Sequence, residues 1–255
     1  PYIGCFIFLT SETIMDLSGK HILVTGASRG IGRTLARTYV ENSAQVTGCA
    51  TSEDLLSELQ EECKDLPGEF EFVVADLTQD EDVIDLVETG VKRFGNIDVL
   101  VNNAGILGPR DEIADYPDEI WDRVIDVNLN AVFHLTKAVL QTMQENKSGR
   151  IINVTSGVGV NGYARWGAYS VSKFGIEGLT QILADELKDT EIEANAVNPG
   201  PISTEMRAEA YPDENPATIP SPEEIMDIFL FLASEQSVGN NGKRYEAQEF
   251  TLQED

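Results

Sequence analysis

The sequence predicts a single α/β domain in which helices cover both faces of a doubly wound parallel sheet of about seven strands. Three observations lead to this fold class. Short apolar runs alternate with longer helical patterns, an order that lays successive strands side by side in parallel. A glycine-rich turn follows the first apolar run, and small or turn-forming residues follow several later ones. Neither a linker nor a repeat divides the 255 residues, a length that is normal for one α/β domain.

The first half of the chain supplies four strands and three helices. The first expected strand, residues 21–25, is a short apolar run fit for a buried parallel sheet, and further strands are expected at 45–49, 69–74 and 99–101. The expected helices extend from the glycine turn to about Glu41, then over 52–63 and 80–94. Asp76 ends the third strand, where it could cap the following helix or hold an adenine amino group.

The second half continues the alternation after a loop at residues 106–117. It predicts helices at 118–145, 168–187 and 222–233, and strands at 151–154, 193–197 and 245–250. The segment from 201 to 222 is rich in Pro, Glu and Asp and is expected to be mobile. Asn128 and Asn130 fall inside the first of these helices, and Asn is a mediocre helix former. Asn128 is therefore expected either to kink the helix or to order a water molecule.

The glycine turn reads Gly26-Ala27-Ser28-Arg29-Gly30-Ile31-Gly32. Glycines allow a tight turn and let the backbone approach a phosphate group at the N-terminus of the next helix. The spacing is Gly-x-x-x-Gly-x-Gly, which differs from the Gly-x-Gly-x-x-Gly of many dinucleotide folds. Because a strand precedes the turn and a helix follows it, the pattern indicates a dinucleotide site.

The end of the second strand indicates which dinucleotide binds. Folds that select NAD often place an acid there, on the ribose hydroxyl. This strand ends in Ala50-Thr51-Ser52, with no acid before Glu53. The guanidinium group of Arg29 could pair with a 2′-phosphate, although it could also simply be solvated. We therefore expect NADP(H) in preference to NAD(H).

Tyr169 and Lys173 lie four residues apart in a predicted helix, so the phenol and the ammonium share one helical face. A nearby cation favours the phenolate and lowers a phenol pKa of about 10, which suits Tyr169 to proton transfer. Ser156 follows the strand at 151–154 and could meet both groups over a carbonyl. Taken alone, Tyr-x-x-x-Lys is common by chance, and its ordinary interpretation is a solvated helix face.

Composition narrows the function further. The net charge of −26 argues against nucleic acid and against anionic membrane surfaces as partners, and no apolar run is long enough to span a membrane. Acidity spread over most helices suits a protein kept soluble in high salt, so we hypothesise a salt-loving source, with an ordinary acidic cytosolic protein as the alternative. Three cysteines without metal-ligand spacing indicate reduced thiols in a cytoplasmic protein. Only two histidines are present, and we expect no metal site.

Residues 1–14 are expected to be an N-terminal extension, either native or not native, that precedes one domain over residues 15–255. They contain a short apolar run without preceding basic residues or a clear cleavage site, so they do not match a signal peptide. Met15 lies just before the first clear strand and could be the natural start.

With these motifs in place, the sequence resembles the short-chain dehydrogenase/reductase family, within it the 3-oxoacyl-[acyl-carrier-protein] reductase-like branch, from about Leu17 to Ala233. The resemblance implies a Rossmann-type fold. The matching motifs are Thr25-Gly26-Ala27-Ser28-Arg29-Gly30-Ile31-Gly32, Asp76-Leu77, Asn102-Asn103-Ala104-Gly105, Asn128, Ser156, Tyr169 with Lys173, and Asn198-Pro199-Gly200.

The resemblance implies an NADP(H)-dependent carbonyl reductase or alcohol dehydrogenase. Tyr169 would exchange a proton with the substrate oxygen, Lys173 would lower the Tyr169 pKa and hold the nicotinamide ribose, and Ser156 would bond the carbonyl. Asn128 would hold a water molecule that links Lys173 to solvent. Besides Tyr169 and Lys173, the cofactor would contact Gly26, Ser28, Arg29, Gly30, Ile31, Gly32, Ala50, Thr51, Ser52, Asp76, Leu77, Asn103, Ala104, Gly105, Pro199, Gly200, Ile202 and Thr204.

The chain departs from the family pattern in its ending, which lacks the usual Asp-Gly-Gly, and in a short substrate loop from Pro201 to Ser221. Ile106, Leu107, Tyr163, Trp166 and Met206 are expected to line the substrate pocket, or else to be ordinary packing residues. The expected partners are a small carbonyl or alcohol substrate and other copies of the chain, as a homotetramer or homodimer. The alternative function is a non-catalytic, nucleotide-binding regulator or scaffold that has kept the fold.

Overall fold

The computed structural model describes residues 15–252, so the predictions for residues 1–14 lie outside the described chain. Its centre is one seven-stranded sheet in which every neighbouring pair is parallel, in the order β3-β2-β1-β4-β5-β6-β7. The strands are β1 (His21–Thr25), β2 (Gln45–Ala50), β3 (Glu69–Val74), β4 (Val99–Asn102), β5 (Ser148–Val154), β6 (Glu191–Asn198) and β7 (Arg244–Glu246). The predicted fold class, a Rossmann-type doubly wound parallel sheet, is confirmed.

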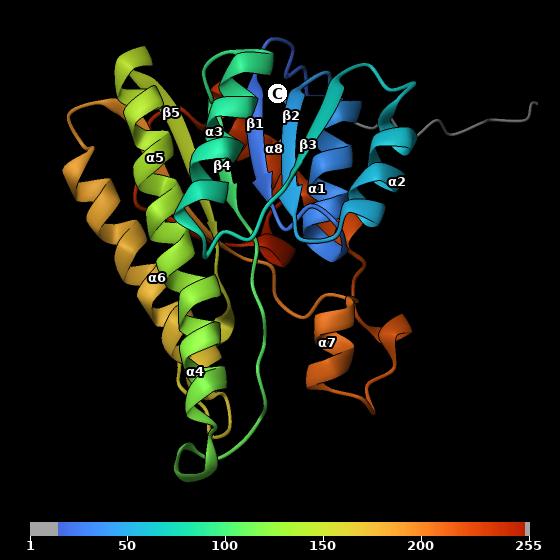
Figure 1. Cartoon of the computed structure of the whole chain (residues 1–255), viewed down its shortest axis with the longest axis vertical. Helices are drawn as coiled ribbons and strands as arrows, with labels where there is room; N and C mark the ends of the chain where they lie inside the picture. Colours follow the sequence, from blue (N-terminus) through green and yellow to red (C-terminus); the bar gives the residue numbers. More distant parts are fainter. Residues whose placement is uncertain (1–14, 253–255) are drawn as a thin grey trace, which may run out of the picture.

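Two layers of helices bury the two faces of the sheet (Figure 1). One face packs against α1 (Gly30–Glu41), α2 (Glu53–Cys63) and α8 (Met226–Ala233), with Leu35, Leu56 and Phe229 fully buried between them. The other face packs against α3 (Asp80–Phe94), α5 (Ala131–Asn146) and α6 (Gly167–Glu186). Burial on both faces explains why the central strands β1 and β4 are buried along their whole length, whereas the edge strand β3 alternates polar and apolar residues.

Two helices extend beyond the carboxyl ends of the strands, α4 (Asp118–Ile125) and α7 (Glu205–Ala210) (Figure 1). In an open α/β sheet this edge is where ligands bind. The order of the strands also reverses between β1 and β4, because the chain first builds outward to β3 and then returns to the other side of β1. The fold therefore places its ligand crevice between β1 and β4, beneath α4 and α7.

The predicted helix over 118–145 is interrupted by a π-helical segment, Asp126–Asn130, between α4 and α5. Such a segment inserts one extra residue into a helix and turns the following side chains. Asn128 lies in it and is fully buried. The helix is therefore locally irregular at Asn128, while the expectation that Asn128 orders a water molecule stays a prediction.

The segment 201–222, expected to be mobile, contains α7 and a short 3₁₀ turn at Pro216–Thr218. The Thr204 hydroxyl caps α7 by accepting a hydrogen bond from the Arg207 N–H (3.2 Å). Arg207 also forms a bidentate ion pair with Glu214, with both N···O distances 2.6 Å. Local charge pairing and capping thus give this acidic segment a defined conformation that its composition does not reveal.

The last predicted strand, 245–250, is shorter than expected. Only Arg244–Glu246 pairs with β6, and the chain then enters a 3₁₀ turn at Ala247–Glu249. Gln248 on this turn donates to the carbonyl oxygens of Pro199 (3.0 Å) and Pro201 (2.9 Å). The unusual C-terminal sequence therefore packs against the loop after β6. The predicted helix at 222–233 likewise begins with a 3₁₀ turn, Pro222–Ile225, before α8.

Within residues 15–252, no helix is both long and apolar enough to cross a bilayer. The same residues hold no group of three or more His, Cys, Asp or Glu side chains that could bind a metal ion. Cys49 and Cys63 are free and buried, and burial raises the pKa of the Cys63 thiol to about 11. A thiol with a raised pKa is a poor nucleophile, so these two cysteines are structural.

Candidate active site

A cavity of about 670 Å³ opens at the carboxyl ends of the central strands. Most of the residues that the sequence predicts to contact the cofactor or the substrate line this cavity. They are Gly26, Ser28, Arg29, Gly30, Ile31, Gly32, Ala50, Thr51, Asp76, Leu77, Asn103, Ala104, Gly105, Ile106, Leu107, Ser156, Trp166, Tyr169, Lys173, Pro199, Gly200, Ile202, Thr204 and Met206. Three nominated residues do not: Ser52, Asn128 and Tyr163.

The glycine turn has the geometry that a phosphate cradle needs. Gly26 and Gly30 have φ of +68° and +53°, values that glycine adopts at little steric cost. A Cβ on Gly32 would lie 2.1 Å from the Gly26 carbonyl oxygen, so only hydrogen fits where α1 meets the turn. The first N–H groups of α1 receive no side-chain cap, which leaves them free for an anion.

The opposite wall of the cradle is tied to the end of β1. The Thr25 hydroxyl oxygen accepts from the backbone N–H groups of Asn103 and Ala104, each at 2.9 Å. The Asn103 amide also donates to the Thr25 carbonyl oxygen (2.9 Å). These bonds fix the segment after β4 beside the glycine turn, so the cavity is formed before any ligand arrives.

At the far end of the cavity, Asp76 does not cap α3, whose N-cap residue is Gln79. Its carboxylate instead accepts from the Thr78 hydroxyl (2.8 Å) and the Thr78 N–H (3.1 Å). These bonds close a turn that leaves the Asp76 carboxylate at the cavity wall. Ser52 lies just outside the wall as the N-cap residue of α2.

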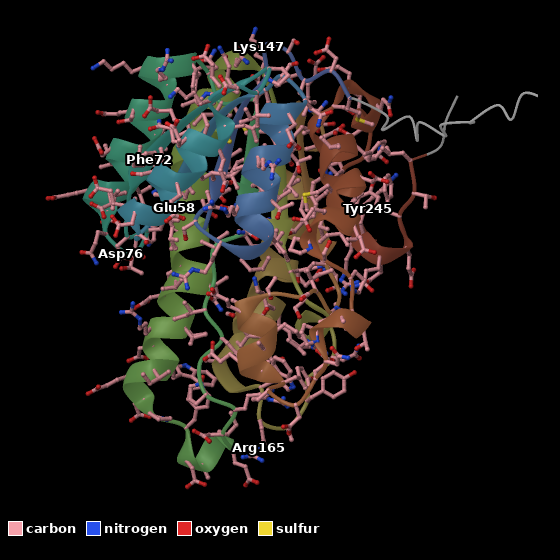
Figure 2. The ribbon with its side chains drawn as sticks, turned by 90° about the vertical axis from the view of Figure 1, so that its right-hand side faces the viewer. Glu58, Phe72, Asp76, Lys147, Arg165 and Tyr245 are labelled. Atoms are coloured by element: carbon pink, nitrogen blue, oxygen red, sulfur yellow. The ribbon has the colours of Figure 1, made fainter. Side chains whose placement is uncertain are left out.

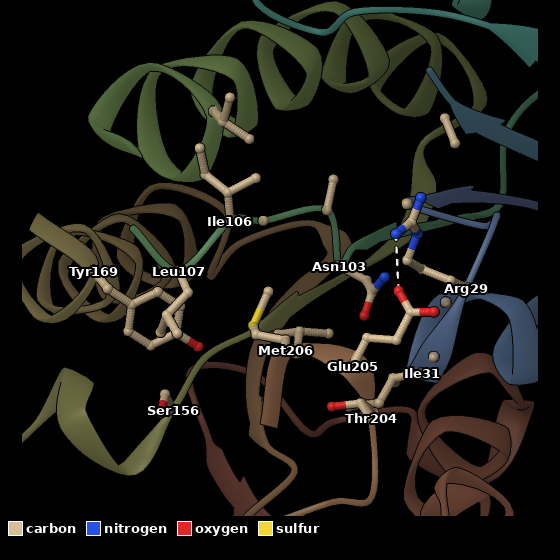
Figure 3. Close-up of a pocket in the computed structure, with 18 of the residues that line it drawn as sticks. Arg29, Ile31, Asn103, Ile106, Leu107, Ser156, Tyr169, Thr204, Glu205 and Met206 are labelled. Atoms are coloured by element: carbon tan, nitrogen blue, oxygen red, sulfur yellow. Dashed lines mark hydrogen bonds and ion pairs between the residues drawn. The ribbon is translucent and has the colours of Figure 1, made fainter. Parts of the chain in front are cut away.

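Arg29 is not a free solvated side chain, because it forms an ion pair with Glu205 at the start of α7. The Arg29 Nη1 and Glu205 Oε2 atoms are 2.8 Å apart (Figure 3). Both side chains are largely exposed, at 59% and 75%, so this ion pair contributes little free energy. No sequence pattern indicated Glu205, which lies 176 residues from Arg29.

Ser156, Tyr169 and Lys173 meet at the other end of the cavity. Ser156 follows β5, and Figure 3 shows its hydroxyl beside the Tyr169 phenol. Lys173, one turn along α6, has its ammonium nitrogen 5.7 Å from the centre of the Tyr169 ring. Lys173 also donates to the Val154 carbonyl oxygen (2.8 Å), which holds it against the end of β5.

Burial governs the pKa values of this pair. Removal from water lowers the pKa of Lys173 to about 8, with the Glu177 carboxylate opposing the shift. Removal from water also raises the pKa of Tyr169, and the Ser156 hydroxyl opposes it. For the protein alone, the net shift of the Tyr169 pKa is therefore opposite to the expected lowering, because burial outweighs the factors that favour the phenolate. A phenol that stays protonated at neutral pH can act as the proton donor for carbonyl reduction.

Asn128 acts on the cavity from behind its wall. Its amide oxygen accepts from the Ile106 N–H (2.8 Å), and its amide nitrogen donates to the Ile106 carbonyl oxygen (2.9 Å). It also donates to the Ser172 hydroxyl (3.2 Å). The side chain thus clamps the segment after β4 to α6. The implied water relay through Asn128 stays a prediction.

Glu177 is a residue that the sequence analysis missed, although its spacing of four residues from Lys173 could have indicated it. Its buried carboxylate accepts from the Thr155 hydroxyl (2.7 Å) and the Arg244 guanidinium (2.9 Å). Arg244 also reaches the Ser156 carbonyl oxygen at 3.4 Å. This network joins α6, β7 and the loop of Ser156, and it supplies the negative charge nearest to Lys173.

Four of the five predicted substrate-pocket residues line the cavity, and Tyr163 does not. The Tyr163 side chain is 61% exposed, in the loop before α6. The Trp166 ring lies 5.9 Å from the Tyr169 ring, centre to centre, and forms the wall next to the phenol. The pocket for a substrate is therefore bounded by Trp166, Leu107, Ile106 and Met206.

The lowered pKa of Lys173 makes a stability prediction. Between pH 8 and 10.5 the unfolded chain binds a proton at this lysine that the folded protein has lost, so stability rises with pH across this window. We expect the unfolding free energy of the wild type, relative to Lys173→Met, to increase by up to about 3 kcal/mol, since each pH unit is worth about 1.4 kcal/mol. Urea titrations at several pH values measure it. Lys137→Met removes an exposed lysine of α5 and keeps Lys173. The unfolding free energy of the wild type relative to this variant should therefore show no such rise.

A glycine-rich turn at a helix N-terminus that shares one cavity with a buried phenol is typical of a Rossmann-type oxidoreductase. The comparison with protein families agrees. The chain belongs to the short chain dehydrogenase family, whose model matches residues 20–215.

Several relatives share most of the chain. A 3-oxoacyl-[acyl-carrier-protein] reductase of Thermotoga maritima is 39% identical, over 88% of this chain and 94% of its own length. An uncharacterised oxidoreductase of Escherichia coli, YciK, is 35% identical, over 91% and 93%. Among solved structures, a short chain dehydrogenase from Salmonella enterica superposes with a TM-score of 0.88 at 35% identity, covering 92% and 98% of the two chains. One from Shigella flexneri, in complex with NADP, has a TM-score of 0.87 at 34% identity, covering 92% and 99%.

Proposed function

We propose that this protein is an NADP(H)-dependent reductase of carbonyl compounds, which in the reverse direction oxidises secondary alcohols. The observation that carries the proposal is the position of Tyr169 and Ser156 in the same cavity as the glycine turn. The non-catalytic alternative would require no proton donor there. The 3-oxoacyl-[acyl-carrier-protein] reductases among the relatives support 3-oxoacyl compounds as the first substrates to try.

The residues divide the work of the reaction. A nicotinamide cofactor held at the glycine turn would supply the hydride that adds to the carbonyl carbon. The Ser156 hydroxyl donates a hydrogen bond to the carbonyl oxygen and stabilises the negative charge that develops there. The Tyr169 phenol gives its proton to that oxygen, so the ketone gains one hydride and one proton and becomes an alcohol.

Lys173 acts on the phenolate that this step leaves. An ammonium 5.7 Å from the Tyr169 ring stabilises the phenolate once it forms, although burial keeps the neutral phenol favoured beforehand. Glu177, by favouring the charged form of Lys173, supports the same step. Reprotonation of Tyr169 through Lys173 and a water near Asn128 is the relay that the family resemblance implies.

The preference for NADP(H) rests on Arg29. Its guanidinium lies in the glycine turn, at the cavity wall shared with Ala50 and Thr51, and the end of β2 itself carries no carboxylate for a ribose hydroxyl. Relatives solved in complex with NADP or NADPH support the same preference. A 2′-phosphate would exchange the weak, exposed Glu205 partner for a doubly charged one.

Substitutions in the Arg29–Glu205 ion pair should change the affinity for NADPH but not the affinity for NADH. Arg29→Gln removes the cation and is expected to weaken NADPH binding about tenfold or more, since a charge-assisted hydrogen bond is worth about 1.5–3 kcal/mol. Glu205→Gln removes a carboxylate that repels the phosphate and should tighten NADPH binding by a factor of about two to five. Calorimetric titration measures both. NADH is the internal control, because it lacks the 2′-phosphate and should bind all three proteins equally.

An equal loss of NADH and NADPH affinity in Arg29→Gln would mean that Arg29 contributes only to the turn. Tighter binding of NADH than NADPH by the wild type would reverse the cofactor preference. A folded wild type that bound neither nucleotide would contradict the proposed function itself.

Association of several copies is a second proposal, as a dimer or tetramer. α4, α5 and α6 expose large apolar side chains: Ile120, Phe133, Val171, Phe174 and Ile182, between 38% and 57% exposed. Exposed apolar side chains on adjoining helices are typical of an interface between subunits. Sedimentation equilibrium would decide it, since a monomer at micromolar concentration contradicts the proposal.

We also propose that the acidic surface is an adaptation to salt. With 44 acidic and 18 basic residues, self-repulsion opposes the folded state at low ionic strength, and salt screens it. The melting temperature is therefore expected to rise by several degrees from about 0.05 M to 2 M KCl. A melting temperature that is flat or falls over this range would contradict the proposal.

A further inference from the structure

The ten arginines of the chain divide into two groups, and all ten lie in the described residues. Seven form ion pairs with acidic side chains: Arg29, Arg33, Arg37, Arg93, Arg150, Arg207 and Arg244. Among the residues that the structure describes, no carboxylate pairs with Arg110, Arg123 or Arg165. In a chain with more than twice as many acids as bases, unpaired arginines call for an explanation.

All three unpaired arginines lie at the substrate end of the molecule. Arg123, on α4, lines the main cavity. Arg110 and Arg165 line a second hollow of about 440 Å³, together with Leu107, Gly108, Pro109, Glu209, Ala210 and Pro212. Leu107, Gly108, Glu209 and Ala210 line both spaces, so the second hollow, here termed the vestibule, adjoins the main cavity.

Arg110 is held rigidly in the vestibule without a charged partner. Its guanidinium carbon lies 4.5 Å from the centre of the Trp166 ring and 4.9 Å from that of Tyr211. Nη1 donates to the Ala210 carbonyl oxygen (3.0 Å), whereas the buried Nε has no hydrogen-bond partner. Two aromatic faces and one hydrogen bond thus fix a cation that still has donors to spare.

Arg165 is brought to the same place by an unusual backbone conformation. Its φ is +69°, which costs free energy for a residue with a Cβ. Its Nε donates to the Arg110 carbonyl oxygen (2.9 Å), which links the two arginines. Figure 2 shows Arg165 at the end of the molecule opposite Lys147, beyond the carboxyl ends of the strands. Among acidic residues, Glu209 also lines the vestibule, and Asp111 and Glu112 follow Arg110 in the chain. Arg207 on α7 is paired with Glu214.

The vestibule is close to the reacting groups. Trp166 touches both sites, because its ring lies 5.9 Å from the Tyr169 ring and 4.5 Å from the Arg110 guanidinium. A ligand whose carbonyl lies at Tyr169 therefore passes one aromatic side chain before it reaches Arg110. That separation suits a small molecule with a few bonds between its carbonyl and a second functional group.

We propose that the substrate carries an anionic group, a carboxylate or a phosphate, which Arg110 and Arg165 bind while its carbonyl lies at Tyr169 and Ser156. The inference rests on the proposed function and specifies its substrate class: a small oxo acid or a phosphorylated carbonyl compound. Guanidinium groups suit both anions, because their forked donors match two oxygens at once. A neutral acyl thioester would gain nothing from these two arginines.

Turnover of matched substrates tests the proposal. 3-Oxobutanoate and its ethyl ester present the same carbonyl, with and without a negative charge, and dihydroxyacetone phosphate tests the phosphate source. At constant ionic strength, we expect at least a tenfold larger kcat/KM for one of the anions than for the ester. Arg165→Gln should abolish that advantage through KM, and leave the ester within about twofold. Arg165→Lys should restore part of it. The matched control is Arg93→Gln, which removes one surface arginine far from the cavity and should change neither.

Binding provides a readout that does not depend on turnover. Trp121→Phe leaves Trp166 as the only tryptophan, and an anion at Arg110 would alter its fluorescence. A saturable fluorescence change with 3-oxobutanoate or dihydroxyacetone phosphate, whose affinity falls about tenfold in Arg165→Gln, supports the vestibule as an anion site. If this change occurs but no compound is reduced, the proposed function is contradicted and the anion site still stands. Ester turnover equal to that of both anions, or fluorescence unchanged by both anions, would overturn the vestibule proposal and leave the proposed function standing.

Discussion

Tyr169→Phe is expected to lower kcat for carbonyl reduction by about three orders of magnitude, since proton transfer by a positioned side chain contributes roughly 10²–10⁴-fold. The substitution removes only the phenol oxygen. The ring stays in contact with Trp166, and the cofactor end of the cavity is untouched. NADPH binding should therefore remain within a few-fold of the wild type, while turnover is lost. Steady-state kinetics and calorimetric titration of the same preparations measure the two effects.

Tyr245→Phe is the matched control for this variant. It also removes a phenol oxygen, but one on β7 that bonds Asn240 (3.2 Å) and does not line the cavity. It should retain wild-type kcat. If Tyr169→Phe kept more than about a tenth of the wild-type kcat, another group would have to supply the proton, and the assigned role of Tyr169 would be wrong.

Gly32→Ala is expected to eliminate cofactor binding and to destabilise the fold. The added Cβ would lie 2.1 Å from the Gly26 carbonyl oxygen and 2.5 Å from the Asn103 amide nitrogen. Neither neighbour can retreat easily, because one is the backbone of the glycine turn and the other is bonded to β1. Either α1 moves away from the turn, which destroys the phosphate cradle, or the turn rearranges. We expect at least a hundredfold loss of NADPH affinity and a clearly lower melting temperature.

Gly178→Ala offers a sharp contrast within the same chain. Gly178 also lies inside a helix, α6, but a Cβ there would meet no atom within 4 Å. Alanine is the better helix former by about 1 kcal/mol, so this variant should be slightly more stable than the wild type and bind NADPH normally. A similar, small effect of both substitutions would show that the tight contact at Gly32 does not exist in solution.

The predictable part of this structure is the part that nearby residues determine. The order of strands and helices follows from apolar runs and their spacing. The glycine turn after β1 and the pairing of Tyr169 with Lys173 are local patterns with a direct physical meaning, the first through backbone conformation and the second through helical periodicity. Ser156 is predictable because a residue that follows a parallel strand must lie at the ligand-binding edge of the sheet.

The rest depends on contacts between distant parts of the chain. Glu205 reaches Arg29 only because α7 folds over the cavity, and Arg110 meets Trp166 and Tyr211 only when three loops converge. No local sequence pattern predicts either contact. The pKa values are equally unpredictable, since they follow from burial: the spacing of Tyr169 and Lys173 suggested a lowered phenol pKa, whereas loss of water raises it.

Errors at the edges of elements have similar causes. Within residues 201–222, whose expected mobility stays a prediction, α7 forms with a Thr204 cap and with the Arg207–Glu214 pair, neither of which the composition indicates. The last strand stops at Glu246 because the following turn bonds to the loop after β6 through Gln248. Tyr163 was expected in the substrate pocket, yet its loop directs it to solvent.

The most direct test of the central claim is transfer of deuterium from NADPH labelled at C4 of the nicotinamide to a ketone, followed by mass spectrometry of the alcohol. The labels at the two C4 positions should be tested separately. We expect the wild type to place one deuterium on the carbinol carbon from one of the two positions, and Tyr169→Phe to give almost none under the same conditions. A folded, NADPH-binding wild type that transferred deuterium to none of the 3-oxo acids, their esters or the phosphorylated ketone would contradict the claim that this cavity reduces carbonyl compounds.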